Sequence, residues 1–208
     1  PPPKPKKRSR SHGAPQSKAR PKGKRAPGPA DPPDPEVVIA GMESDDVLEV
    51  VFELDEDEQR QVLDAIPPGD RILIEEGLTY PEDSAGRLMQ REVVTVPESW
   101  TVGETIDFLR QSADSGDDDL PARFYDVFIV DPAHRPVGSL PLSRLLRTRR
   151  PVAVADIMDR EMKLLPVATD QEEVAYVFRQ RDLVSAPVVD DSGRLVGAIT
   201  IDDVVDVI

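Results

Sequence analysis

An internal repeat limits what this chain can fold into more than any other feature of its sequence. One segment opens at Arg87-Leu88-Met89 and runs to Gly138, and a similar segment opens at Asp156-Ile157-Met158 and runs to Gly197. Each crosses a Val-rich stretch that ends in Val-Pro or Leu-Pro and continues with the apolar spacing of an amphipathic helix. Each closes with a polar turn between two apolar strands. The sequence therefore predicts two copies of one α/β unit.

The repeat divides the chain into four expected parts. Copy one is expected over residues 81–150 and copy two over residues 151–208, and extra residues around Gly116-Asp117-Asp118-Asp119 in copy one predict a flexible loop. Residues 36–80 carry apolar side chains at helical spacing and predict a short all-α domain. Residues 1–35 hold half of the 22 prolines among Lys, Arg, Ser and Gly, which predicts a disordered basic tail.

Composition argues against several classes of function. The chain has no cysteine and only two histidines, His12 and His134, so thiolate sites are excluded and a zinc site or a Ser-His-Asp triad has little to build on. We predict that the chain is not an enzyme. No apolar run approaches the ~18 residues that cross a bilayer, so this segment is expected to be soluble. Because an apolar helical pattern continues to Val207-Ile208, we expect it to be part of a longer protein.

Charge is divided unevenly along the chain. The formal net charge is −14, but residues 1–35 hold ten Lys or Arg and only two Asp. The remaining residues therefore carry 16 basic and 38 acidic side chains, a net charge of −22. A surface this acidic repels nucleic acid and attracts divalent cations. We therefore expect no nucleic-acid partner.

Several motifs point to a known family. Residues 80–89 read Tyr-Pro-Glu-Asp-Ser-Ala-Gly-Arg-Leu-Met, residues 188–197 read Val-Val-Asp-Asp-Ser-Gly-Arg-Leu-Val-Gly, and residues 196–204 read Val-Gly-Ala-Ile-Thr-Ile-Asp-Asp-Val. The two copies resemble a pair of CBS domains, and residues 80–89 resemble the junction before the first CBS domain of MgtE magnesium channels. The resemblance covers residues 43–208, although the helical N domain of the family is longer than the segment here.

The resemblance implies both a fold and a function. The fold class is α/β, a tandem CBS domain pair preceded by a short all-α domain and a basic tail, with a homodimer formed through the CBS helices. The function implied is that of the Mg²⁺-sensing module of a magnesium channel, on the cytoplasmic side of the cell membrane. The transmembrane pore domain would belong to the same parent chain. In the family, Mg²⁺ bridges acidic surfaces and holds a compact closed state, and its loss favours pore opening.

The resemblance also implies the ion-binding carboxylates. In the CBS pair they are Glu172, Asp182, Asp203 and Asp206, with Asp202 and Glu173 as further members. Oxygen ligands without imidazole or thiolate suit Mg²⁺, which keeps most of its waters and needs only one or two carboxylates. For the helical domain the candidates are Asp55, Asp57 and Asp70.

Each of these carboxylates also has a purely structural interpretation. Thr169-x-x-Glu172 and Thr200-x-x-Asp203 both have the spacing of a capping box, in which the side chains satisfy exposed amides at a helix start. Residues 55–58 are acidic at a predicted helix start, where the helix dipole favours carboxylates. For any one residue, capping and ion binding both stay open.

An adenosine nucleotide such as ATP is the second ligand to consider. CBS domains often bind one, and a Ser/Thr-x-x-Asp at the last helix then takes the ribose hydroxyls. Thr200 and Asp203 fit that pattern, Tyr125 is placed to stack a purine, and the equivalent positions in copy one are Pro141 and Arg144. The alternative function is therefore that of a nucleotide sensor regulating another partner protein.

Overall fold

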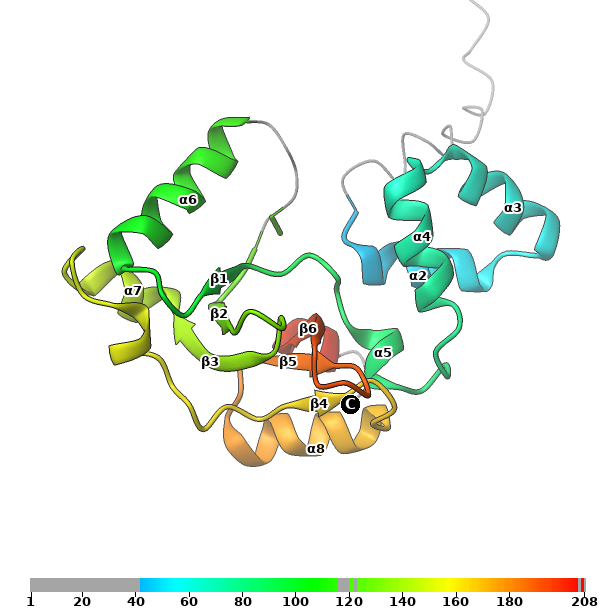
Figure 1. Ribbon diagram of the computed structural model, residues 1–208. Helices are drawn as coiled ribbons and strands as arrows, with labels where there is room; N and C mark the ends of the chain where they lie inside the picture. The colour runs from blue at the N-terminus through cyan, green and yellow to red at the C-terminus, as the bar shows by residue number, and fades with distance from the viewer. Residues whose placement is uncertain (1–41, 116–119, 122, 206, 208) are drawn as a thin grey trace, which may run out of the picture. The chain divides into compact units, whose positions relative to one another are not determined.

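The computed structural model describes residues 42–115, 120–121, 123–205 and 207 (Figure 1). The predictions made for the tail at residues 1–35, for the loop at Gly116-Asp117-Asp118-Asp119 and for Asp206 lie outside the described residues. The described helices and strands all belong to one compact unit.

Three short helices form the N-terminal part of this unit. They are α2 (Ser44–Glu53), α3 (Glu56–Ala65) and α4 (Pro68–Gly77). Asp55 begins α3 with a capping box, because its carboxylate accepts from the Glu58 amide at 2.9 Å while the Glu58 carboxylate accepts from the Asp55 amide at 3.2 Å. The apolar faces of the helices meet in a small core made by Val47, Leu48, Val51, Val62, Ile66 and Ile74. The structure thus confirms the predicted short helices.

Copy one is a three-stranded sheet with two helices. After the short helix α5 (Ala85–Leu88), its elements are β1 (Thr95–Pro97), α6 (Val102–Ser115), β2 (Asp126–Val130), β3 (Pro136–Pro141) and α7 (Leu142–Arg147). Strand β1 pairs in parallel with β2, and β2 pairs antiparallel with β3. The ring of Trp100 lies edge-on to that of Phe108 on α6, with ring centroids 5.6 Å apart, which closes the core under the helix.

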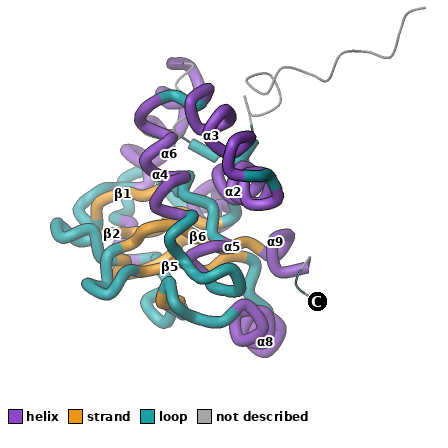
Figure 2. The backbone as a smooth tube through the Cα atoms, turned by 90° about the vertical axis from the view of Figure 1, so that its right-hand side faces the viewer, coloured by secondary structure: helices purple, strands orange, loops and turns teal. Residues whose placement is uncertain are grey.

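Copy two repeats this arrangement. Its elements are η1 (Val154–Asp156), β4 (Leu165–Pro166), α8 (Gln171–Arg181), β5 (Ser185–Val189), β6 (Leu195–Thr200) and α9 (Ile201–Val205). Strand β4 pairs in parallel with β5, and β5 pairs antiparallel with β6. Helix α8 lies below β5 and β6 in the view of Figure 2. The ring of Phe178 on α8 is fully buried in the apolar core of copy two.

The two sheets share their register as well as their strand order. Ile129 faces Gly138 in copy one, and Val188 faces Gly197 in copy two. The pairing shifts by one residue immediately after each of these pairs. The internal repeat of the sequence is therefore a repeat of backbone geometry, as predicted.

The opening segment of copy one packs into copy two. Ala85 and Met89 belong to the apolar core of copy two. Gln90 and Ala198 of β6 exchange two backbone hydrogen bonds of 3.0 Å. A Cβ added at Gly197 would lie 2.6 Å from the Gln90 carbonyl oxygen and 2.7 Å from the Met89 sulfur, so only glycine permits this close approach.

The opening segment of copy two returns the same contact to copy one. Val154 and Met158 belong to the apolar core of copy one. Asp159 and Ser139 of β3 exchange backbone hydrogen bonds of 2.7 and 2.9 Å. The Met158 side chain covers Gly138, where a Cβ would collide with it. The Leu-Met and Ile-Met pairs recur in the sequence because each opening segment completes the other copy.

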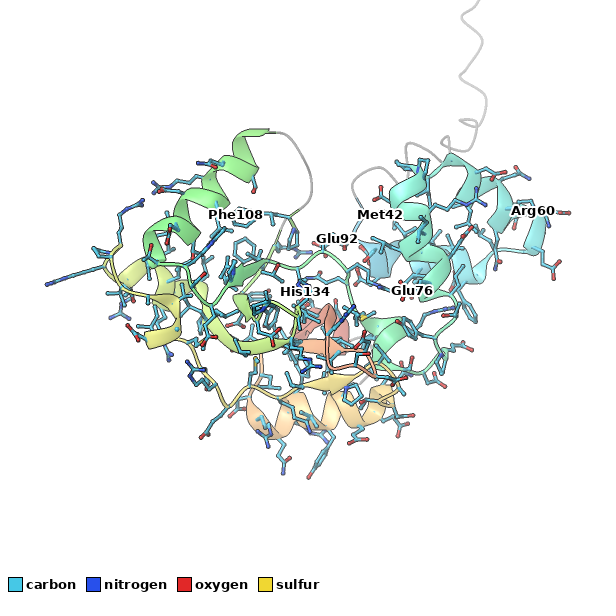
Figure 3. All side chains as sticks on the ribbon, in the orientation of Figure 1. Met42, Arg60, Glu76, Glu92, Phe108 and His134 are labelled. Carbon is cyan, nitrogen blue, oxygen red and sulfur yellow. The ribbon has the colours of Figure 1, made fainter. Side chains whose placement is uncertain are left out.

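A polar joint connects α2 to the start of copy one. The hydroxyl of Ser44, which is 5% exposed, donates to the Glu92 carboxylate at 2.8 Å and accepts from the Arg91 amide at 2.7 Å. The Arg91 side chain is 6% exposed and lies 3.4 Å from the Glu76 carboxylate of α4 (Figure 3, where Glu76 and Glu92 are labelled). These contacts link the helical part to copy one.

Candidate functional site

Carboxylates gather around a cavity of about 500 Å³ between α2, the segment before α5, and α9. We call it the acidic cavity. Its lining includes one cation, Arg87, and the apolar Phe52, Leu88 and Val207 with Gln171. Its seven carboxylates are Asp45, Asp46, Glu49, Glu53, Glu82, Asp83 and Asp203.

Helix α2 supplies four of these carboxylates from one face. Residues three and four apart lie next to each other on a helix, which places Asp46 and Glu53 on either side of Glu49. The opposite face is anchored in the core by Leu48 and Val51. The polar face of the amphipathic helix α2 therefore forms one wall of the acidic cavity. Because the apolar face of α2 is held in the core, the helix cannot turn these carboxylates away from the cavity.

Helix α9 presents Asp203 from the other side of the cavity. The Thr200 amide donates to the Asp203 carboxylate at 2.7 Å, and the Thr200 hydroxyl bonds to it at 3.0 Å and also bonds to Asp202. One half of the predicted capping box at Thr200 is thus confirmed, because the Asp203 carboxylate accepts from the Thr200 amide, whereas the Thr200 hydroxyl donates to the two carboxylates. The bond to Thr200 fixes the Asp203 side chain on the wall of the cavity. The Asp203 carboxylate can therefore cap the helix and face the cavity at the same time.

Burial and mutual repulsion make the cavity unfavourable for negative charge. Burial, with repulsion from Asp203 as the next cause, raises the pKa of Asp45 from 3.8 to about 7. One Asp45 carboxylate oxygen, Oδ1, is buried without a hydrogen-bond partner. Burial also raises the pKa of Asp203 and, near the same surface, that of Glu43. Asp45 and Asp203 are therefore two acids held where ionisation is costly unless a cation is present.

The other predicted ligands lie elsewhere. Glu172 and Glu173 are exposed in the first turn of α8, Asp182 ends α8 in a left-handed conformation with φ 51°, and Asp202 is exposed. The predicted capping by Thr169 is wrong, because Asp170 is the N-cap and accepts from the Glu172 amide at 2.9 Å. The exposed side chains Asp55, Asp57 and Asp70 do not line the acidic cavity.

The described residues contain no ready-made chelating cage. Nowhere among them do three or more His, Cys, Asp or Glu side chains come together closely enough to hold one ion. A site of one or two carboxylates that leaves the waters of the ion in place is the arrangement that suits Mg²⁺. The donor set is therefore compatible with a hydrated ion between α2 and α9.

A second cavity of about 770 Å³ lies between the two copies. This inter-copy cavity is lined by Tyr125, which is 41% exposed, and by the start of β5. The Ser185 hydroxyl donates to the Asp126 carboxylate at 2.5 Å, and burial raises the pKa of Asp126 despite that bond. The charged side chains of the lining are Arg144, Lys163, Arg181, Asp126, Asp159, Glu161 and Asp182.

The three predicted nucleotide-binding residues do not share one site. Tyr125 lines the inter-copy cavity, whereas Asp203 lines the acidic cavity and Thr200 is its capping partner. Arg144, at the copy-one position equivalent to Asp203, lines the inter-copy cavity and donates to the Ile157 carbonyl at 2.9 Å. The combination expected from sequence is therefore wrong: one cavity has the aromatic side chain and the cations, and the other has the Thr-x-x-Asp motif.

Comparison with known families assigns both parts of the fold. The CBS domain family matches residues 85–150 and 154–208, and the MgtE intracellular N domain matches residues 31–83. A crystal structure of the cytosolic domain of the Mg²⁺ channel MgtE in complex with ATP is 34% identical, with a TM-score of 0.77, over 84% of this chain and 69% of that one. The chain belongs to the MgtE family. The predicted family and fold class are therefore confirmed.

Two other relatives agree. The magnesium transporter MgtE of Thermus thermophilus is 37% identical over 163 residues, which is 78% of this chain and 35% of that protein. A crystal structure of the soluble part of a magnesium transporter is 28% identical with a TM-score of 0.76, over 84% of this chain and 67% of that one. The chain thus spans about a third of the length of the curated relatives that it matches.

Membership of MgtE fits the other broad predictions. The family consists of transport proteins and not of enzymes, as predicted. Among the described residues, no helix is both long enough and apolar enough to cross a membrane.

Sequence reasoning missed the α2 side of the acidic cavity. The sequence-based candidates of the helical part lie further along the chain, at α3 and α4, and do not include Asp45, Asp46 or Glu49. The signal available was the i, i+4 spacing of Asp45, Glu49 and Glu53 opposite the apolar residues of α2. That spacing predicts a polar helix face, but it does not predict which other segment of the chain lies opposite that face.

Proposed function

We propose that this MgtE chain is the cytosolic Mg²⁺-sensing module of a magnesium channel or transporter. The observation that carries the proposal is the acidic cavity, in which the Asp45 carboxylate of α2 is buried, partly unpartnered and repelled by Asp203 of α9. The relatives that are named as a Mg²⁺ channel and as magnesium transporters support the same interpretation.

The proposed mechanism is linkage between ion binding and domain contact. The carboxylates of Asp45, Asp46 and Glu49 on α2 and Asp203 on α9 would hold a hydrated Mg²⁺ between the helical part and copy two. The ion supplies positive charge where burial has made negative charge unfavourable. Because only the compact arrangement brings both sets of carboxylates together, binding stabilises it by about 1.4 kcal/mol at a concentration ten times the dissociation constant.

Loss of the ion leaves the carboxylates facing one another. Two carboxylates about 6 Å apart repel by roughly 2 to 3 kcal/mol at an effective dielectric constant near 20. That repulsion favours separation of α2 from α9. In the parent protein, separation at low Mg²⁺ would release the pore and favour opening, and the closed state would return as Mg²⁺ rises.

Several parts of this proposal concern the whole protein. The module would lie on the cytoplasmic side of the membrane, form a homodimer through the CBS helices, and act on a transmembrane pore domain of the same parent chain. The remaining predicted ligands would bind Mg²⁺ more weakly, outside the acidic cavity and at or near the contact between protomers. They are Glu172, Glu173, Asp182, Asp202 and Asp206.

The proposal is tested by small-angle scattering and thermal unfolding across millimolar Mg²⁺. We expect the wild-type chain to become more compact and more stable as Mg²⁺ rises, and Asp203→Asn to require more Mg²⁺ for the same change. The amide oxygen of the new side chain still caps the helix, so folding is preserved. Asp191→Asn, on an exposed side chain that lines neither cavity and is not a candidate ligand, is the matched control. An unchanged radius of gyration and melting temperature in the wild-type chain would contradict the proposal.

A second candidate function is adenosine-nucleotide binding in the inter-copy cavity. Its volume of about 770 Å³, the half-exposed ring of Tyr125 and the cations Arg144, Lys163 and Arg181 suit a stacked base and a phosphate chain. A relative in complex with ATP supports it. Calorimetry should show ATP binding that Tyr125→Ala weakens. Nucleotide binding without Mg²⁺-dependent compaction would instead favour a nucleotide sensor that regulates another partner.

A further inference from the structure

Arg87 places a fixed positive charge among the carboxylates of the acidic cavity. It lies in α5, is half-buried, and is the only Lys or Arg in the lining formed by the described residues. Burial lowers the pKa of its guanidinium, and the negative charge of Glu82 opposes that shift. The cavity therefore already contains one cation before any ion enters.

The helical part of the chain holds this guanidinium through contacts that leave its charge uncancelled. The Arg87 guanidinium carbon lies 4.6 Å from the centre of the Phe52 ring of α2, a cation–π contact. One guanidinium nitrogen, Nη1, donates to the Gly77 carbonyl at the end of α4 at 3.3 Å. Among the described residues no carboxylate lies within salt-bridge distance, 4.0 Å, of this guanidinium. Its charge thus acts on the cavity as a whole.

We propose that Arg87 is a built-in counter-ion that weakens divalent-cation binding in the acidic cavity and so sets the Mg²⁺ concentration to which the module responds. The inference rests on the proposed Mg²⁺-sensing function. Without Mg²⁺ the guanidinium offsets part of the repulsion among the carboxylates and tethers α2 and α4 to α5. With Mg²⁺ the same charge repels the incoming ion. The result is a site of lower affinity for Mg²⁺, and a smaller difference in stability between the Mg²⁺-free and Mg²⁺-bound forms of the module.

The size of the effect follows from Coulomb's law. A unit charge about 8 Å from a divalent ion in a water-like dielectric changes the affinity for that ion by about fivefold, and a less polar surrounding increases the factor. Removing the charge should therefore lower the half-saturating Mg²⁺ concentration by about fivefold. Loss of a merely structural contact predicts the opposite sign, because a looser α2 would bind the ion more weakly.

The test is a Mg²⁺ titration, followed by calorimetry and by melting temperature, of the wild-type chain and three variants. Arg87→Met keeps an apolar side chain against Phe52, and Arg87→Gln keeps a donor for the Gly77 carbonyl. Because each variant preserves a different contact, the test does not depend on the folding of either one. Both should bind Mg²⁺ about fivefold more tightly. Arg87→Lys keeps the charge and should stay within about twofold of wild type.

The outcomes separate the inference from the function on which it rests. If the wild-type protein responds to Mg²⁺ but the midpoint of the charge-removing variants is unchanged or raised, the role of Arg87 is overturned and the proposed function stands. Equal tightening in Arg87→Lys and Arg87→Met also overturns it, because the charge would not be the cause. A wild-type chain that Mg²⁺ neither stabilises nor binds overturns both the inference and the proposed function.

Discussion

Replacing Asp45 by asparagine should stabilise the metal-free protein at high pH. The Asp45 carboxylate is mostly buried, one of its oxygens has no partner, and its pKa is raised from 3.8 to about 7. A carboxyl group whose pKa is higher in the folded state than in the unfolded state stabilises the fold while protonated, and that contribution disappears as the pH rises through the folded-state pKa. The asparagine side chain has nearly the shape of the protonated acid and never ionises.

The magnitude follows from the shift. A pKa raised from 3.8 to about 7 corresponds to about 4 kcal/mol of unfolding free energy at 1.36 kcal/mol per unit. Asp45→Asn should thus gain up to about 4 kcal/mol over wild type near pH 8 and less than about 2 kcal/mol near pH 5, where wild-type Asp45 is mostly protonated in the folded state. Relaxation around the ionised carboxylate lowers these values but leaves the sign and the pH trend unchanged.

Urea unfolding followed by circular dichroism, in EDTA at several pH values, measures this difference. Asp70→Asn, on an exposed carboxylate, is the control and should stay close to wild type throughout. If Asp45→Asn is less stable than wild type near pH 8, or if its advantage does not change with pH, the pKa of Asp45 is not raised by its surroundings, which contradicts the prediction. Added Mg²⁺ should reduce the advantage, because the ionised wild-type cavity is the form that binds it.

Three further substitutions test the packing, each by urea unfolding. Gly197→Ala should cost about 1 to 3 kcal/mol, since its Cβ would lie 2.6 Å from the Gln90 carbonyl oxygen; unchanged stability would show that the close approach is not needed. Ser44→Ala removes the hydroxyl that donates to Glu92 at 2.8 Å and should cost about 1 to 3 kcal/mol, whereas a neutral result would mean that the joint is not formed in solution. Phe178→Ala should cost about 3 to 5 kcal/mol because its ring is fully buried, and a cost below about 1 kcal/mol would place the ring outside the core.

The fold was predictable because the repeat carries local signals. Short continuous apolar runs bounded by turn residues predict strands such as Val127 to Val130, and Thr200 with Asp203 predicts a helix start by simple spacing. What spacing does not reveal is which copy a segment completes. Met89 begins copy one in sequence but lies in the core of copy two, and such a contact depends on tertiary packing between segments far apart in the chain.

The candidate site was only partly predictable for the same reason. Asp203 was found because a family motif contains it, but its neighbours on α2 carry no motif and are recognised only when two distant helices meet. Asp203 fits the ribose-binding motif of CBS domains and Tyr125 is an aromatic side chain near the cleft-facing strand, yet the two line different cavities. Residue types and spacing indicate the chemistry available, and the fold decides which groups act together.

The exchange of opening segments between the two copies makes each half of the pair dependent on the other. A polypeptide ending near residue 150 would keep its Met89 side chain but lose the Gly197 surface on which it packs, and its own Gly138 would be uncovered. Such a fragment could bury these surfaces only by pairing with a second molecule of the same fragment. Duplication and fusion of an ancestral half that already associated in this way would yield the present chain, and the two halves would be expected to melt in a single transition.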